Sequence, residues 1–247
     1  MSDASGETTE RNLVTLSRLC AIHQPNFFPW LGYFDKMRRA DVFVLLDAVD
    51  YPRAGSDGMG SIVNRVMIAV QGQPRPVGAP LRHVALGTPI DAIEMDDTQP
   101  WREKLVRTLS MNYARAVNFK PTMAMLEPVI RYPERNLAAF NINAITAIAA
   151  ALGLTTPLVR QSSLAVPGAA TELLIGLTKA VGCTSYLAGG GATGYQQDGM
   201  FAAAGLGLVY QRFVPKPYGP AFIPGLSVID YLMHDGRALA VAPPADR

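Results

Sequence analysis

The sequence is poor in the residues that build metal centres and disulfide frameworks. Its 247 residues include only two cysteines and three histidines. Because no Cys-x-x-Cys or His-x-x-x-His pair occurs, neither a structural zinc site nor any other bound cofactor is predicted. Cys20 and Cys183 both lie in apolar stretches. This placement is typical of two reduced, buried thiols in a cytoplasmic protein.

Long apolar runs and a strong charge imbalance are also missing. No run reaches the length of a transmembrane helix, and residues 1–11 are polar with acidic side chains, unlike a signal peptide. The 22 basic and 20 acidic residues give a net charge of +2, and no basic block stands out. The sequence therefore predicts a cytoplasmic protein that neither inserts into a membrane nor binds nucleic acid.

The chain does contain enough apolar residues for a substantial core. Hydrophobic residues make up 49% of the chain, and the mean hydropathy is +0.14. A single domain of this size is ordinary among α/β proteins. Residues 1–16 are polar with few apolar anchors, which is typical of a flexible arm. We therefore expect an N-terminal arm at 1–16 and one domain at 17–247.

Short apolar runs alternate with amphipathic segments in the first 50 residues and again from residue 155. This alternation predicts an α/β fold with a mostly parallel sheet flanked by helices. Helical periodicity and capping residues predict an inserted helical segment around 97–152. Between these parts we expect strands at 62–70 and 77–81, joined by a turn at 71–75, and another strand at 90–95.

Polar side chains stand where the first two predicted strands end. His23 and Gln24 end the first strand (18–24), and Asp47 ends the second strand (41–47). Ligands of open α/β sheets bind beyond the carboxyl ends of the strands. His23 is a candidate general base or, equally, a residue that orders the following loop. Asp47 is a candidate to orient His23 or bind a ligand, or else it caps a turn.

Two further segments carry candidate contacts. Asn64 and Arg65 interrupt an apolar strand, so one of them should point inward, and a buried arginine requires an anionic partner. The glycine-rich segment 189–194 joins a strand to a helix, where backbone amides can hold a phosphate or an oxyanion. Its spacing fits neither a Walker loop nor a Gly-x-Gly-x-x-Gly fingerprint, so a tight turn is the alternative. The candidate ligand contacts are Gln24, Tyr33, Asn64, Gly189, Gly190, Gly191, Thr193, Tyr195 and Tyr218.

A cysteine–histidine dyad is the remaining candidate, and the spacing argues against it. Cys20 and His23 are three residues apart on one strand, so their side chains project to opposite faces. The sequence therefore predicts that Cys20 belongs to the core.

Several blocks of the sequence resemble the WbqC-like protein family. They are His-Gln-Pro-Asn-Phe-Phe-Pro-Trp-Leu-Gly-Tyr-Phe-Asp-Lys at 23–36, Asp41 to Asp47, Asn64-Arg65, Tyr186 to Tyr195 and Leu226 to Asp230. Members of that family are encoded in gene clusters for O-antigen, other surface polysaccharides or natural products. The resemblance therefore implies a role in such a biosynthetic pathway. A weaker, fold-level similarity links the turn after the first strand to nucleotidylyltransferases of the HUP type, although both histidines of their motif are missing.

These observations predict a small-molecule biosynthetic transferase. The expected reaction is acyl or aminoacyl transfer from an activated carrier, such as an acyl carrier protein, onto an amine. His23, Asp47 and Arg65 are the predicted catalytic residues, as base, orienting acid and anion holder. Two alternatives stay open, a nucleotidyltransferase-like enzyme and a non-catalytic partner of a carrier protein or glycosyltransferase.

Overall fold

A five-stranded parallel sheet forms the centre of the computed structural model, which describes residues 17–53, 60–190 and 197–237. Its strands are β1 (Leu19–His23), β2 (Val42–Leu45), β5 (Leu158–Arg160), β6 (Ser185–Ala188) and β7 (Gly207–Tyr210). They lie in the order β5-β2-β1-β6-β7, and each neighbouring pair is parallel. The predicted α/β class with a parallel sheet is confirmed.

The order of the strands places one crevice at the middle of the sheet. Numbered along the chain, the five strands run 3-2-1-4-5, so the direction of winding reverses between β1 and β6. In doubly wound sheets a ligand binds at this reversal, outside the carboxyl ends of the two strands. The fold therefore directs attention to the residues that follow β1 and β6.

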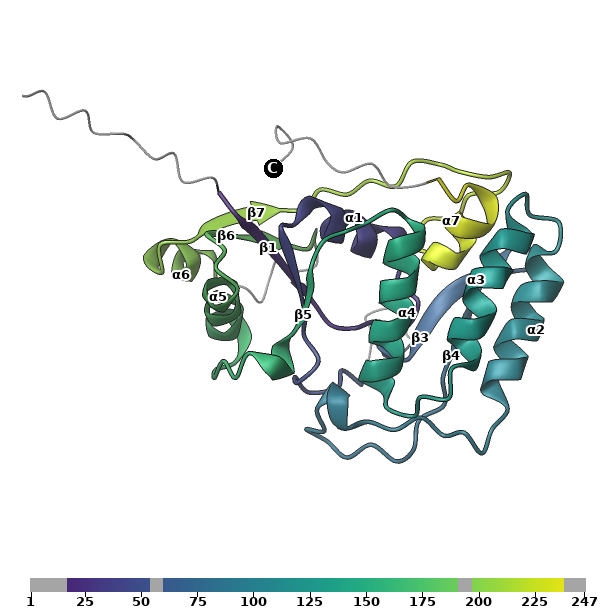
Figure 1. The fold of residues 1–247 in the computed structure, drawn as a ribbon, viewed down its shortest axis with the longest axis horizontal. Helices are drawn as coiled ribbons and strands as arrows, with labels where there is room; N and C mark the ends of the chain where they lie inside the picture. Colours follow the sequence, from purple (N-terminus) through teal and green to yellow (C-terminus); the bar gives the residue numbers. More distant parts are fainter. Residues whose placement is uncertain (1–16, 54–59, 191–196, 238–247) are drawn as a thin grey trace, which may run out of the picture.

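Both faces of the sheet are buried, as continuous apolar strands require. Cys20 and Ile22 of β1 pack in a cluster with α5 (Ala170–Ala180) and α6 (Asp198–Ala203). Ala21, between them, packs in the other cluster, with α1 (Leu31–Arg39). Figure 1 shows α5 and α6 to the left of the strands and the larger layer of helices to the right. Cys20 thus lies in the core, fully buried.

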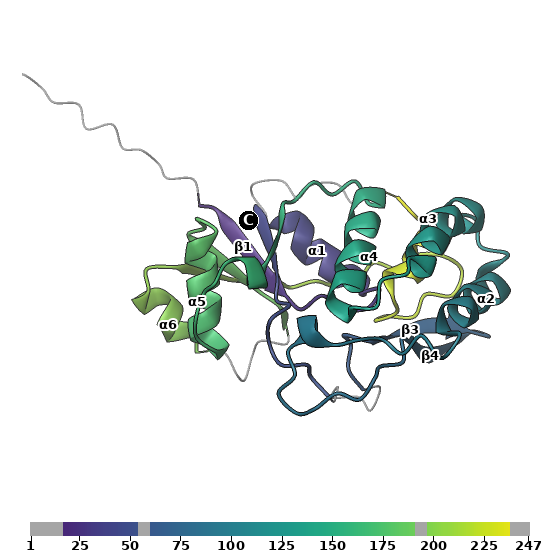
Figure 2. The ribbon, with the colours of Figure 1, turned by 60° about the horizontal axis from the view of Figure 1, so that its bottom comes forward.

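The predicted helical insertion is confirmed. It consists of α2 (Trp101–Tyr113), α3 (Phe119–Arg131) and α4 (Leu137–Ala151). Asn136 caps α4 by accepting a hydrogen bond from the amide of Ala139 at 2.9 Å. In both views these helices lie beside α7 (Val228–His234) and the hairpin of β3 (Arg65–Val70) and β4 (Gln73–Gly78) (Figures 1 and 2).

Two local predictions were wrong. The turn of the hairpin is only Gln71-Gly72, and β4 begins at Gln73, so Pro74, which was assigned to the turn, lies in the strand. Pro74 and Pro76 are tolerated because β4 pairs only with β3 within the described residues, and proline is accepted on an outer strand. The strand expected at 90–95 is instead a 3-10 turn, Ile90–Ala92, followed by isolated bridges.

Other predicted features fall wholly or partly outside the described residues. These are the arm at 1–16 and residues 191–196, which include most of the glycine-rich segment after β6. Within residues 17–53, 60–190 and 197–237, none of the helices combines the length and hydropathy needed to cross a bilayer.

Candidate functional site at the carboxyl edge of the sheet

Several of the predicted site residues meet where the sheet reverses its winding. β1 ends at His23 and is followed by Gln24, while β6 ends at Ala188 and is followed by Gly189 and Gly190. Because β1 and β6 are adjacent and parallel, these ends lie at the same edge. The structure therefore brings together the histidine and the first two residues of the glycine-rich segment.

His23 is held by the loop that follows it. Its Nδ1 lies 3.2 Å from the carbonyl oxygen of Gln24, and the ring packs at 4.8 Å, centroid to centroid, against Tyr33. A carbonyl oxygen can only accept, so Nδ1 carries the proton and the lone pair is left on Nε2. Burial and the nearby Lys36 ammonium lower the pKa of His23 to about 3, and the residue as a whole is half-buried. The imidazole is therefore neutral at physiological pH.

Lys36, which was not among the residues predicted from the sequence, extends from α1 to the ends of β1 and β6. Its Nζ donates a 2.8 Å hydrogen bond to the carbonyl oxygen of Ile22. Successive carbonyls of a strand point to opposite neighbours, and that of His23 accepts from Leu46, next to β2. The Ile22 carbonyl therefore faces β6. A Cβ built at Gly189 would lie 3.9 Å from Nζ, which places the ammonium between the two strand ends.

The charge of Lys36 is buried without a counter-ion. Only 3% of the residue is exposed, and no carboxylate of the described residues forms an ion pair with it. The ring of Tyr186 lies 5.6 Å from Nζ and gives weak electrostatic support. Burial lowers the pKa of Lys36 to about 7. A buried lysine with a pKa lowered toward neutrality, at the strand ends where the sheet reverses its winding, is a strong candidate for a functional group.

Asp47 lies at the same edge but belongs to another set of contacts. Its fully buried carboxylate accepts hydrogen bonds from Arg160 Nε at 2.7 Å, Ser162 N at 3.0 Å and Ser162 Oγ at 2.9 Å. The prediction that Asp47 orients His23 does not match these contacts, because the Nδ1 proton of His23 goes to Gln24. Asp47 joins the end of β2 to the turn Gln161–Ser163 after β5.

Arg65 and Asn64 lie in the hairpin, outside the five-stranded sheet. Asn64 is buried, donates to the carbonyl of Ala79 at 3.0 Å and accepts from the hydroxyl of Tyr51 at 2.7 Å. Arg65 is exposed and lines a separate cavity whose lining contains neither His23 nor Asp47. One residue of the pair points inward, as predicted, but it is the asparagine, and the structure does not place Arg65 beside His23.

The remaining predicted contacts are divided among different places. Tyr33 is buried, and its hydroxyl donates to the Gln24 carbonyl at 3.2 Å, so it supports the loop. Tyr218 packs against Tyr231 and Phe222 and lines a cavity of about 480 Å³ beside α7. Gly191, Thr193 and Tyr195 lie outside the described residues.

The sequence contains a signal that would have found Lys36. It follows Gly32 by four residues and Tyr33 by three, so on a helix it shares their face, which is buried. A lysine on the buried face of a short helix beside the first strand is unusual enough to mark. No group of three or more histidine, cysteine, aspartate or glutamate side chains gathers as a metal site in the described part of the chain.

Comparisons with known proteins agree with the resemblance seen in the sequence. The model of the WbqC-like protein family matches residues 24–240. An uncharacterised protein of Mycobacterium tuberculosis is 25% identical over 222 residues, which cover 87% of this chain and 93% of that protein. No solved structure shows significant similarity.

Proposed function

The chain belongs to the WbqC-like protein family, and from that premise we propose that it is a small-molecule transferase with an anionic donor bound over the ends of β1 and β6. One observation carries the proposal: the Lys36 ammonium is buried, and no carboxylate among residues 17–53, 60–190 and 197–237 forms an ion pair with it. An unpaired buried charge costs stability, and a ligand anion would compensate it. Lys36 takes the anion-holding role that the sequence analysis gave to Arg65.

The proposed reaction is acyl or aminoacyl transfer to an amine. The amine nitrogen attacks the acyl carbonyl carbon, and the carbonyl electron pair moves onto oxygen. The Lys36 ammonium stabilises this oxyanion. Nε2 of His23, which no hydrogen bond among the described residues uses, accepts a hydrogen bond from the attacking amine and orients it, and the amine proton stays on the intermediate until the thiol leaves. Collapse of the intermediate re-forms the carbonyl and expels the carrier thiolate, which takes up the proton.

A second function, nucleotidyl transfer, is favoured by the order of the strands. The 3-2-1-4-5 order with a crevice at its reversal is also the arrangement that binds nucleotide phosphates. Here Lys36 would hold a phosphate, as lysines do in other phosphate sites. The two functions share the crevice and differ in the donor.

Thermal unfolding with candidate donors separates these functions. We expect an acyl thioester of phosphopantetheine to raise the melting temperature of the wild type, and more at pH 6.0 than at pH 8.5, because Lys36 is protonated below about pH 7. Lys36→Met should abolish this shift, and the exposed control Lys120→Met should keep it.

The other outcomes decide between the alternatives. A shift with magnesium and ATP or CTP that Lys36→Met abolishes would favour nucleotidyl transfer. Donor binding that is equal in Lys36→Met and Lys120→Met would remove the basis of the proposal. Full pathway activity of a His23→Ala variant would favour the non-catalytic partner over both enzymes.

A further inference from the structure

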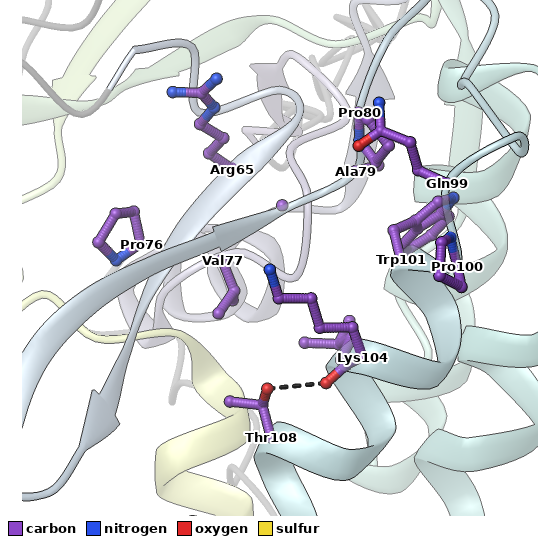
Figure 3. A pocket seen from close by; sticks show the side chains of 12 residues that line it. Arg65, Pro76, Val77, Ala79, Pro80, Gln99, Pro100, Trp101, Lys104 and Thr108 are labelled. Atoms are coloured by element: carbon purple, nitrogen blue, oxygen red, sulfur yellow. Dashed lines mark hydrogen bonds between the residues drawn. The ribbon is translucent and has the colours of Figure 1, made fainter.

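A cavity of about 580 Å³ lies between the β3–β4 hairpin and the beginning of α2 (Figure 3). Its volume is in the range of small-molecule sites. The hairpin and the segment after it contribute Pro76, Val77 and Pro80, and the helix side contributes Pro100, Trp101 and Leu105. The walls are therefore largely apolar, and none of these residues belongs to the crevice at the sheet edge.

The charged residues of the cavity are all of one sign. Arg65 and Lys104 line it, and no aspartate or glutamate of the described ranges does. In Figure 3 the Lys104 side chain extends from α2 toward Val77 on the hairpin. No carboxylate of the described residues forms an ion pair with Lys104. The neighbouring Thr108 hydroxyl donates its proton to the Lys104 backbone carbonyl at 2.7 Å. This hydroxyl proton is therefore already used within the helix, and the Lys104 ammonium is the donor that faces a ligand.

The position of Arg65 depends on a glycine across the hairpin. A Cβ at Gly78 would lie too close to the Asn64 carbonyl oxygen and 2.7 Å from Arg65 Cγ, so a larger residue there would shift both the backbone of β3 and the Arg65 side chain. The aliphatic part of Arg65 therefore lies over Gly78 at the rim of the cavity, and its guanidinium lies beside Gly60.

A small molecule fits this cavity better than an added peptide strand. β4 is the outer strand of the hairpin and carries Pro74 and Pro76, which have no N–H groups. A peptide pairing with this edge would find no donor at either position. Apolar walls with one ammonium group instead suit a compact ligand with an apolar body and one anionic end.

We propose that this cavity binds a small organic anion, a carboxylate or a phosphate monoester, with its anionic group at Lys104 and its apolar body against Trp101, Val77 and Leu105. The site is separate from the transferase crevice, and its test needs no activity.

Trp101 makes the test direct. The chain has two tryptophans, and Trp30→Phe leaves Trp101 as the single emitter. Trp30 packs edge-on against Phe213 at 5.4 Å between centroids, a contact that phenylalanine can keep. In this background, Trp101 emission is titrated with octanoate, octyl phosphate, octanol and octylamine. We expect a saturable change of Trp101 emission with one or both anions. Octanol should bind about tenfold more weakly than the preferred anion, and octylamine should not bind.

Substitutions on α2 supply the matched control. Lys104→Gln should weaken anion binding about tenfold, as expected for one charge-assisted contact. Arg107→Gln, an exposed change on the same helix outside the cavity, should leave it unchanged. Equal responses to octanol and octanoate, or equal losses in the two variants, would overturn the proposal. The preferred anion, carboxylate or phosphate ester, identifies the ligand class.

Discussion

The two halves of the carboxyl edge treat a buried charge in opposite ways. At the ends of β2 and β5, the Asp47 carboxylate receives three hydrogen bonds, one of them from the Arg160 guanidinium. At the ends of β1 and β6, the Lys36 ammonium has one backbone carbonyl as its hydrogen-bond acceptor and no ion pair among the described residues. Both groups are almost completely removed from water.

This difference separates a structural charge from a candidate functional one. A buried carboxylate with its lone pairs filled holds neighbouring segments in place. A buried ammonium with one acceptor destabilises the fold, and such costs concentrate where a ligand or a reaction needs the group. We therefore place function on the β1–β6 side of the edge. The three predictions that follow test that assignment.

The largest effect is expected from Asp47→Ala. The change leaves the Ser162 amide and hydroxyl without their acceptor and the Arg160 guanidinium without its anion. Because the Arg160 side chain is 45% exposed, water compensates part of the loss. We expect a loss of about 2–3 kcal/mol in the free energy of unfolding, measured by urea denaturation. The exposed control Asp50→Ala should stay within about 0.5 kcal/mol of the wild type. Equal losses would mean that the Asp47 contacts stabilise nothing.

The opposite sign is expected for Lys36→Met. The folded-state pKa of about 7 lies below the ordinary 10.5, so between these values the unfolded chain binds more protons than the folded chain. The wild type should therefore gain stability as the pH rises from about 7 to 10.5. At pH 6 the methionine variant should be more stable by about 1–2 kcal/mol, and this advantage should vanish near pH 10. Unfolding curves at several pH values measure it, and a destabilised variant at pH 6 would assign Lys36 a structural role.

The smallest effect is expected from His23→Gln under acid conditions. The pKa of about 3 lies below the ordinary 6.5, so the unfolded chain gains a proton first as the pH falls. The contribution of His23 to stability is complete above pH 6.5 and decreases toward pH 3. Because the residue is half-buried, we expect the variant to lose about 1 kcal/mol less than the wild type between pH 6.5 and 4.5. If the free energies of unfolding of the wild type and the variant fall in parallel between pH 6.5 and 4.5, the imidazole of His23 is not held neutral by the fold.

The sequence predicted strand ends better than side-chain contacts. Continuous apolar runs placed the ends of the first two strands at His23 and close to Asp47, within two residues of the observed bounds. The pairing of these residues was not predictable. Asp47 accepts a hydrogen bond from Ser162, which is more than a hundred residues away in the sequence. That contact exists only because β5 pairs with β2.

The hairpin gives the same lesson. Alternation along the strand predicted that one of Asn64 and Arg65 points inward, and it does. The choice between them was set by partners from distant segments, Ala79 and Tyr51, which satisfy the asparagine amide. Arg65 lines a cavity instead, and the other wall of that cavity is formed by α2.

The sequence by itself determined the α/β class, the family, the inserted helices and the two strand ends that carry His23 and Asp47. Local periodicity and short motifs record these features, because each depends on residues close together in the chain. Only the tertiary structure decided that β6 lies beside β1, and so that Lys36 and Gly189 face each other across the reversal of the sheet. Strand order is set by long-range packing, and a charge becomes buried only when that packing closes around it.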